Sequence, residues 1–369
     1  MIEQLRALPL KQKIGQLFFI GIPGPQVDEA TRELLAEITP GGVCLFARNI
    51  REAEQTRLLL GELGSLSIIK PFLSVDQEGG LVDRLRRIMT PMPAANKLRN
   101  ANDTAEIAAI IAESLRILGF NMDFAPVVDV VDEDRAKYTN GLFSRAYGTS
   151  KEDAFTLGGC FLETLQQHGI IGCIKHFPGL GAANVDSHEE LPQVNITRDE
   201  IFSTDLFPYY ELLKTGAAKA IMVAHAAFPQ VNLQETDQNG RLLPSSLSKN
   251  FITNLLRDEL GFEGLVITDD LEMGAIVKNY GIGEACKMAV VAGADMLAIC
   301  ADPMAIRDGY NAVLRAAQCG EITEDRIDKS LFRISTVKKE FSSPLDLDLQ
   351  RLEQLSNEVA ALNERLNRA

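Results

Sequence analysis

Residues 170–188 read IIGCIKHFPGLGAANVDSH, a short apolar run followed by a glycine-containing stretch with several charged side chains. The run at 170–174 predicts a buried β-strand, and Lys175, His176, Asp186 and His188 come after it. Polar groups that directly follow a buried strand lie at its carboxyl end, where α/β barrels place their chemistry. The chain has only four histidines, so two of them in one stretch indicate an active-site loop.

The same alternation of an apolar run and a longer amphipathic segment extends over most of the chain. Strands are predicted at 17–22, 42–47, 72–75, 121–128, 170–174, 220–224, 265–268 and 296–300. Helices are predicted at 27–38, 51–63, 104–118, 151–168, 198–213, 249–260, 282–292 and 304–318, with a further helix at 323–339. Eight strands, each followed by a helix, predict an α/β fold with a single (β/α)8 TIM-type barrel and extra C-terminal helices.

The domain prediction is a catalytic barrel over residues 1–343 and an amphipathic helix over 344–369. In the second segment, apolar residues recur every three or four positions, at 345, 349, 352, 355, 359, 362 and 366. This stripe predicts a helix that docks on the barrel, or one that forms a dimer seam. We expect a monomer, with a dimer through this helix as the alternative.

Composition excludes several classes of partner. A net charge of -14 argues against binding to nucleic acid or to an anionic membrane, since both require a basic face. Residues 1–13 carry four charged side chains and no long apolar core, so we expect no signal peptide, and no apolar run approaches transmembrane length. The six cysteines are scattered without CxxC spacing, which is typical of reduced thiols in a cytoplasmic protein.

Further polar residues stand at the ends of the other predicted strands. Asp76 and Arg84 follow the third strand, Asp129 follows the fourth, and His225 ends the sixth. Each has a structural alternative, because an Asp after a strand is often a helix N-cap and a buried His is often a hydrogen-bonded structural group. At the end of the seventh strand we assign the cap to Asp270 and expect Asp269 to point into the barrel mouth.

Two chemistries fit these residues equally well. An Asp can attack an anomeric carbon while a second group protonates the leaving oxygen, as in retaining glycosidases. Alternatively, Lys175 can form a Schiff base with a carbonyl substrate, as in barrel aldolases. A metal site is a weaker alternative because no His-x-His pair occurs, so neither a metal nor a cofactor is predicted.

The motifs KHFPGLG, DSH and LP resemble family 3 glycoside hydrolases, in particular the single-domain bacterial β-N-acetylglucosaminidases of peptidoglycan recycling. DQEGG, FAPVVDV, MVAH and GFEGLVITDDLEMGAI match other blocks of that family in the same order, and the resemblance covers residues 14–339. It implies a retaining exo-glycosidase that removes terminal β-N-acetylglucosamine from peptidoglycan fragments or short amino-sugar oligosaccharides. A phosphorylase with the same specificity is the alternative.

The resemblance also implies roles for individual residues. Asp269 matches the nucleophile, His188 the acid/base and Asp186 its dyad partner. The residues that match sugar-binding positions are Asp76, Arg84, Arg145, Lys175 and His176. The chain departs from the common pattern at Leu81, where EGGR is usual, at Leu180, which replaces the His of PGHG, and at Ala182-Ala183, which replaces Asp-Thr.

Overall fold

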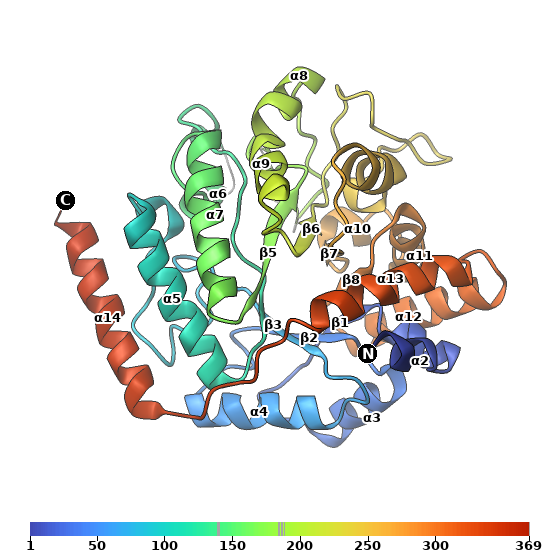
Figure 1. Cartoon of the computed structure of the whole chain (residues 1–369). Helices are drawn as coiled ribbons and strands as arrows, with labels where there is room; N and C mark the ends of the chain where they lie inside the picture. The colour runs from blue at the N-terminus through green and yellow to red at the C-terminus, as the bar shows by residue number, and fades with distance from the viewer. Residues whose placement is uncertain (139–140, 184, 186, 188, 369) are drawn as a thin grey trace.

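Eight parallel strands close into a barrel in chain order, with β8 hydrogen-bonded back to β1. The computed structural model describes residues 1–138, 141–183, 185, 187 and 189–368. The strands are β1 (Phe18–Gly21), β2 (Gly42–Leu45), β3 (Phe72–Val75), β4 (Met122–Asp123), β5 (Ile171–Phe177), β6 (Ala220–Val223), β7 (Leu265–Asp270) and β8 (Met296–Ile299). The predicted (β/α)8 barrel is therefore confirmed (Figure 1).

Helices surround this barrel (Figure 1). The longer ones are α3 (Glu29–Ile38), α4 (Ala53–Ser65), α5 (Ala101–Leu118), α7 (Lys151–Gln167), α9 (Phe207–Thr215), η5 (Asn250–Glu259), α11 (Ile282–Ala292), α12 (Pro303–Gln318), α13 (Glu324–Lys338) and α14 (Leu349–Asn367). The shorter segments are α1 (Ile2–Arg6), α2 (Leu10–Gly15), α6 (Leu142–Arg145), α8 (Arg198–Glu200), η3 (Ile201–Asp205) and α10 (Gly274–Val277), together with η1 (Ala95–Lys97), η2 (Arg135–Lys137) and η4 (Ser245–Leu247).

Helix starts follow from ordinary capping chemistry. Asp28, Asn100 and Ser150 precede α3, α5 and α7, and each side chain accepts a hydrogen bond from a backbone N–H in the first turn. Thr197 and Glu200 form a reciprocal capping box at the start of α8. These caps place the helices close to where their polar–apolar pattern begins.

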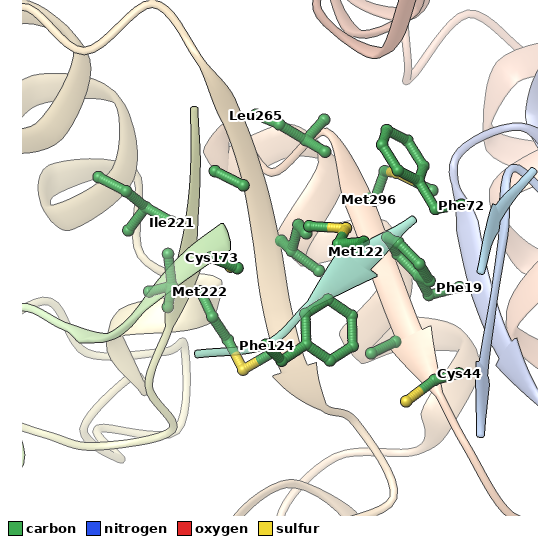
Figure 2. Packing of buried hydrophobic residues seen from close by; sticks show 14 of the residues in the cluster. Phe19, Cys44, Phe72, Met122, Phe124, Cys173, Ile221, Met222, Leu265 and Met296 are labelled. Carbon is green, nitrogen blue, oxygen red and sulfur yellow. The ribbon is translucent and has the colours of Figure 1, made fainter. Parts of the chain in front are cut away.

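Aromatic and sulfur-containing side chains fill the barrel interior (Figure 2). The ring of Phe19 lies 5.5 Å from that of Phe72 and 5.3 Å from that of Phe124, measured between centroids. Gly42 faces Phe19 from the next strand, where a Cβ would lie 2.2 Å from the ring. Glycine is therefore required at this position, and the packed interior closes the barrel below its carboxyl end.

Two strand predictions were wrong at their ends. The predicted strand at 121–128 is reduced to Met122–Asp123, and beyond Pro126 only an isolated bridge between Val127 and Lys175 remains. The fifth strand is longer than predicted and includes Lys175 and His176, which we had assigned to the loop. The backbone of Lys175 pairs with that of Val127, which extends the strand.

One predicted helix is divided. The segment predicted as a helix at 198–213 consists of α8, the π-helical η3 and α9. Pro208 lies near the start of α9 and lacks the N–H that a continuous helix would use. The segment still forms one connection between β5 and β6.

The C-terminal helix α14 packs along α5 of the same chain (Figure 1). Its apolar stripe is buried at Leu352, Leu355, Val359 and Leu362. Arg351 makes two charge-assisted hydrogen bonds of 2.7 and 2.8 Å to the carboxylate of Glu113. The amphipathic pattern is thus explained by contacts within the chain, while the division at residue 343 stays a prediction. No helix in the described residues is both long enough and apolar enough to span a membrane.

Lys338, at the end of α13, is buried near the amino ends of the strands. Only 1% of the residue is exposed. Its ammonium donates a 3.2 Å hydrogen bond to Oε1 of Gln16 and lies 5.2 Å from the ring centroid of Phe72. Neither neighbour is an anion, so burial lowers the pKa of Lys338 to about 7.

We expect Lys338→Met to raise the free energy of unfolding at pH 7 by about 1 to 3 kcal/mol. The methionine side chain is similar in length to lysine but lacks the amine, so no polar group is buried there. The unfolded chain keeps the lysine proton up to about pH 10. The folded chain releases the Lys338 proton near pH 7, so the free energy of unfolding of the wild type rises between about pH 7 and pH 10. The difference in stability between the variant and the wild type therefore becomes smaller as the pH rises. Urea unfolding at pH 7 and pH 9.5 measures this.

Lys339→Met is the matched control, since Lys339 is the exposed neighbour. A stability difference between wild type and Lys338→Met that is the same at both pH values would contradict the prediction.

Candidate active site

A pocket of about 200 Å³ opens at the carboxyl ends of the strands. It is lined by the predicted site residues Asp76, Arg84, Arg145, Lys175, His176 and Asp269. Asp186 and His188 lie outside the described residues. Val185, which precedes Asp186, and Ser187, which lies between the two, line the pocket. The carbonyl of Ser187 accepts a 3.2 Å hydrogen bond from the N–H of Ala275. Ala275 lies in α10, the short helix that follows β7, and β7 carries Asp269.

A buried ion network forms one wall of the pocket. The ammonium of Lys175 lies 2.6 Å from Oδ1 of Asp76 and 2.6 Å from Oε1 of Glu78. The guanidinium of Arg145 donates to both oxygens of Glu78, at 2.7 and 2.9 Å. Glu78 thus joins two cations from different parts of the chain. Burial alone would raise the pKa of Glu78, but Arg145 and Lys175 outweigh it and hold the pKa below its usual range.

Lys175 is a charged structural group in this network. Burial by itself lowers its pKa, but the carboxylates of Asp76 and Glu78 raise the pKa above the ordinary lysine value. A Schiff base requires a neutral amine nucleophile. The geometry therefore disfavours the aldolase-type alternative.

His176 has a defined tautomer. Its Nδ1 lies 2.7 Å from Oδ2 of Asp129, which can only accept, so Nδ1 carries the proton. Its Nε2 lies 3.4 Å from Nη2 of Arg145, which can only donate, so Nε2 accepts. The other oxygen of Asp129 accepts from the N–H of Leu180 at 2.7 Å. Asp129 therefore fixes both the imidazole and the start of the loop after β5.

Arg84 reaches the pocket from the loop after β3. Its backbone N–H donates to Oε1 of Gln77 at 2.8 Å, and its guanidinium lies 5.9 Å from the ring centroid of Phe46. The Nε of Arg84 is buried, and no hydrogen-bond partner is found for it among the described residues. An orphaned buried donor that lines a pocket is suited to a polar ligand atom.

Asp269 lies at the end of β7. Burial opposes ionisation, but His176, His225, the backbone N–H of Asp270 and Lys175 together lower the pKa of Asp269 below its ordinary value. The N–H of Asp270 donates to its Oδ1 at 2.9 Å. The carboxylate is therefore ionised, oriented and open to the pocket.

Asp270 does not cap the following helix, contrary to our assignment. It is the last residue of β7, and its carboxylate accepts a 3.1 Å hydrogen bond from the N–H of Glu272. The helix α10 starts only at Gly274, with Met273 at the cap position. Asp270 also lines the pocket, where burial raises its pKa to about 7.

His225 has a structural role. Its Nε2 donates to the carbonyl of Asp270 at 3.0 Å, so its Nδ1 accepts from the hydroxyl of Ser246 at 2.6 Å. This bond holds the end of β7 in place.

Two important residues were underrated by the sequence reasoning. Glu78 is not among the residues that the sequence analysis selects, and Asp129 is selected there only with a helix cap as its structural alternative. Asp129 directly follows an apolar run and Glu78 lies three residues after one, and this position of a charged residue is the signal that could have identified them. Each orients a predicted sugar-binding residue.

This arrangement favours chemistry that develops positive charge. The ionised carboxylate of Asp269 opens to the pocket, while the cations Lys175 and Arg145 are paired with Asp76 and Glu78. An exposed face of an ionised Asp near the pocket base can stabilise or attack a cationic carbon, as in an oxocarbenium-like transition state.

Known proteins with similar sequences indicate the family to which this chain belongs. Residues 9–337 match the family model described as the glycosyl hydrolase family 3 N terminal domain. A beta-hexosaminidase of Tolumonas auensis is 33% identical over 298 residues, which span 79% of this chain and 85% of that protein. A beta-hexosaminidase of Pseudomonas aeruginosa is 34% identical over 292 residues, spanning 77% of this chain and 82% of that protein.

Solved structures also match. A glycoside hydrolase family 3 beta-N-acetylglucosaminidase from Paenibacillus sp. superposes with a TM-score of 0.87 at 35% identity, covering 96% of this chain and 69% of that one. A glycosyl hydrolase of the same family from Mycobacterium smegmatis superposes with a TM-score of 0.80 at 31% identity, covering 90% and 98%. Because the family model matches most of the length of this chain, the chain belongs to glycosyl hydrolase family 3 and is a glycoside hydrolase.

Proposed function

We propose that this enzyme is a retaining exo-glycosidase that removes terminal β-N-acetylglucosamine from peptidoglycan fragments or short amino-sugar oligosaccharides. The observation that carries the proposal is the ionised Asp269 in a pocket of about 200 Å³. This pocket volume is smaller than the volume of about 300 to 1,000 Å³ that is typical of pockets for drug-sized ligands. The pocket has room for one terminal sugar, which supports exo action. The names of the relatives support the amino-sugar specificity.

In the proposed first step, Asp269 attacks the anomeric carbon and forms a covalent glycosyl ester. The bond to the leaving oxygen breaks, and His188 protonates that oxygen. In the second step, His188 takes a proton from water, which attacks the anomeric carbon and releases Asp269. A histidine suits both steps because its ordinary pKa of about 6.5 lies near neutral pH. Asp186 is proposed to orient His188 and to stabilise its protonated form.

The buried network is proposed to recognise the sugar. Asp76 and Arg84 offer an acceptor and a donor at the pocket wall, while Arg145, Lys175 and His176 fix the geometry behind them. All six cysteines are unpaired, which fits a reducing compartment, so we place the enzyme in the cytoplasm.

The test of this function is a comparison of aryl β-N-acetylglucosaminide with aryl β-glucoside. A pocket that hydrogen-bonds a buried group rejects an analogue without it, because the protein's own polar atoms are left unpaired. We expect kcat/KM to favour the N-acetylglucosaminide by at least about 100-fold. Comparable values on both glycosides would rule out the proposed specificity.

Asp269 should carry the covalent intermediate. A slow fluorinated N-acetylglucosaminide is expected to inactivate the enzyme and to label a peptide that contains Asp269, and tandem mass spectrometry can assign the residue. Asp269→Asn should abolish both labelling and turnover. A label on the adjacent Asp270, or on Asp76, would contradict the assignment.

Asp129 should act as a positioning residue for His176. We expect Asp129→Asn to lower kcat/KM by about 10- to 100-fold, since a charge-assisted hydrogen bond contributes about 1.5 to 3 kcal/mol. The pH profile should also change, because the asparagine no longer selects one tautomer of His176. Glu133→Gln, which makes the same acid-to-amide change at an exposed carboxylate four residues away, is the matched control. An unchanged pH profile together with normal kcat/KM would show that Asp129 only supports the fold.

A further inference from the structure

The basic side chains of the pocket are not all held in the same way. Four of the described residues that line the pocket are basic, and three of these are held by carboxylates, namely Arg145, Lys175 and His176. The fourth is Arg84. No hydrogen-bond or ion-pair partner is found for its guanidinium among the described residues, and its Nε is buried. Something other than a carboxylate must therefore hold the side chain of Arg84 in place.

The ring of Phe46 makes that contact. Cζ of Arg84 lies 5.9 Å from the centroid of the ring. At separations up to about 6 Å the face of an aromatic ring attracts a guanidinium, and the attraction is stronger where water is partly excluded. Both residues are half-buried, and both line the pocket. Phe46 therefore restricts the positions that the guanidinium can take.

Phe46 is itself fixed at the ends of three strands. It directly follows β2, and its backbone N–H donates a 2.9 Å hydrogen bond to Oδ1 of Asn49. Cζ of Arg48 lies 4.6 Å from the centroid of the same ring. The Nε of Arg48 donates to the carbonyl of Ile22 at 3.0 Å, and its Nη2 donates to the carbonyl of Cys300. The ring is thus tied to the residues that follow β1 and β8.

The two arginines on this ring differ in what their donors do. Arg48 uses its donors on backbone carbonyls and is not among the described residues that line the pocket. Arg84 lines the pocket, and its N–H groups have no acceptor in the described part of the chain. A guanidinium carries five N–H donors in one plane, and a carboxylate partner would occupy two of them. An aromatic ring holds the cation and leaves these donors for a ligand.

We propose that Phe46 is the positioning residue for Arg84, and that its ring orients the guanidinium while leaving the N–H donors free for the terminal sugar. This rests on the proposed function, in which Arg84 binds that sugar. Phe46 exerts this effect through Arg84. The end of β2 is then one of the strand ends that serve the site.

Phe46→Leu tests the contribution of the ring, because leucine keeps an apolar side chain but has no aromatic face. We expect kcat/KM for aryl β-N-acetylglucosaminide to fall by about 3- to 30-fold, which corresponds to the loss of one cation–π contact. Phe46→Tyr keeps the ring and should stay within about threefold of wild type. Phe332→Leu makes the same change at a phenylalanine that is 54% exposed on α13, and this matched control should leave kcat/KM unchanged.

A double-mutant cycle separates positioning of Arg84 from general support of the fold. In an Arg84→Ala background, Phe46→Leu should change kcat/KM by less than about twofold, because the residue through which it acts is gone. In an Asp129→Asn background, Phe46→Leu should cost the same factor as in wild type, because Asp129 contacts His176 and not Arg84. Where Arg84→Ala is too slow for kinetics, calorimetry measures the same cycle as the Kd of N-acetylglucosamine.

A change of less than about twofold for Phe46→Leu would overturn the inference. So would an equal loss with and without Arg84, since that result assigns Phe46 to the fold alone. In either case, hydrolysis of aryl β-N-acetylglucosaminide by the wild type would leave the proposed function intact. Failure of the wild type to cleave any N-acetylglucosaminide would instead remove the proposed function, and the inference with it.

Discussion

The bridge from Lys175 through Glu78 to Arg145 is the interaction on which the site depends. It joins the loop after β3, the strand β5 and the short helix α6, which are held together by a carboxylate between two cations. Removing one partner of a buried ion pair typically costs about 3 to 5 kcal/mol, because the other charge is left without compensation. Such a network tolerates few arrangements of its three segments. The wall that we propose to bind the sugar is therefore set before substrate arrives, as catalysis by electrostatic preorganisation requires.

The network also contributes to the charge state of Asp269, the proposed nucleophile, because Lys175 is one of the groups that lower the pKa of Asp269. Asp269 is ionised in spite of its burial because cations and a backbone N–H surround it. The ammonium of Lys175 contributes to this field while Asp76 and Glu78 hold it in place. An ionised carboxylate that opens to the pocket then favours a transition state in which the sugar ring becomes positive.

The sequence was sufficient to predict the barrel, and the six described residues that the family resemblance proposed for the site line one pocket. Each of Asp76, Lys175 and Asp269 follows a buried apolar run, and parallel strands bring such positions to one end of the barrel. The partners of these residues were not predictable in the same way. The role of Asp129 depends on a contact with His176, 47 positions away in the chain. Likewise, the assignment of Asp270 as a cap failed because β7 continues through it, which is a matter of pairing with β8.

The C-terminal helix extends this dependence to the outside of the barrel. Ser356 accepts a 2.8 Å hydrogen bond from the N–H of Thr90, and Asn363 donates to the carbonyl of Pro91 at 2.9 Å. The adjoining N–H of Met92 donates at 2.9 Å to Asp83, which lies next to Arg84 in the chain.

Asp83 also accepts from the side chain of Gln77, and Gln77 in turn accepts from the N–H of Arg84. A continuous series of hydrogen bonds thus connects α14 to the loop that presents Asp76 and Arg84 to the pocket. Because a loop of this length has little regular structure of its own, these contacts supply the order that its function requires. The apolar stripe that predicts the helix and the polar residues that we propose to recognise the sugar are therefore parts of one packing arrangement.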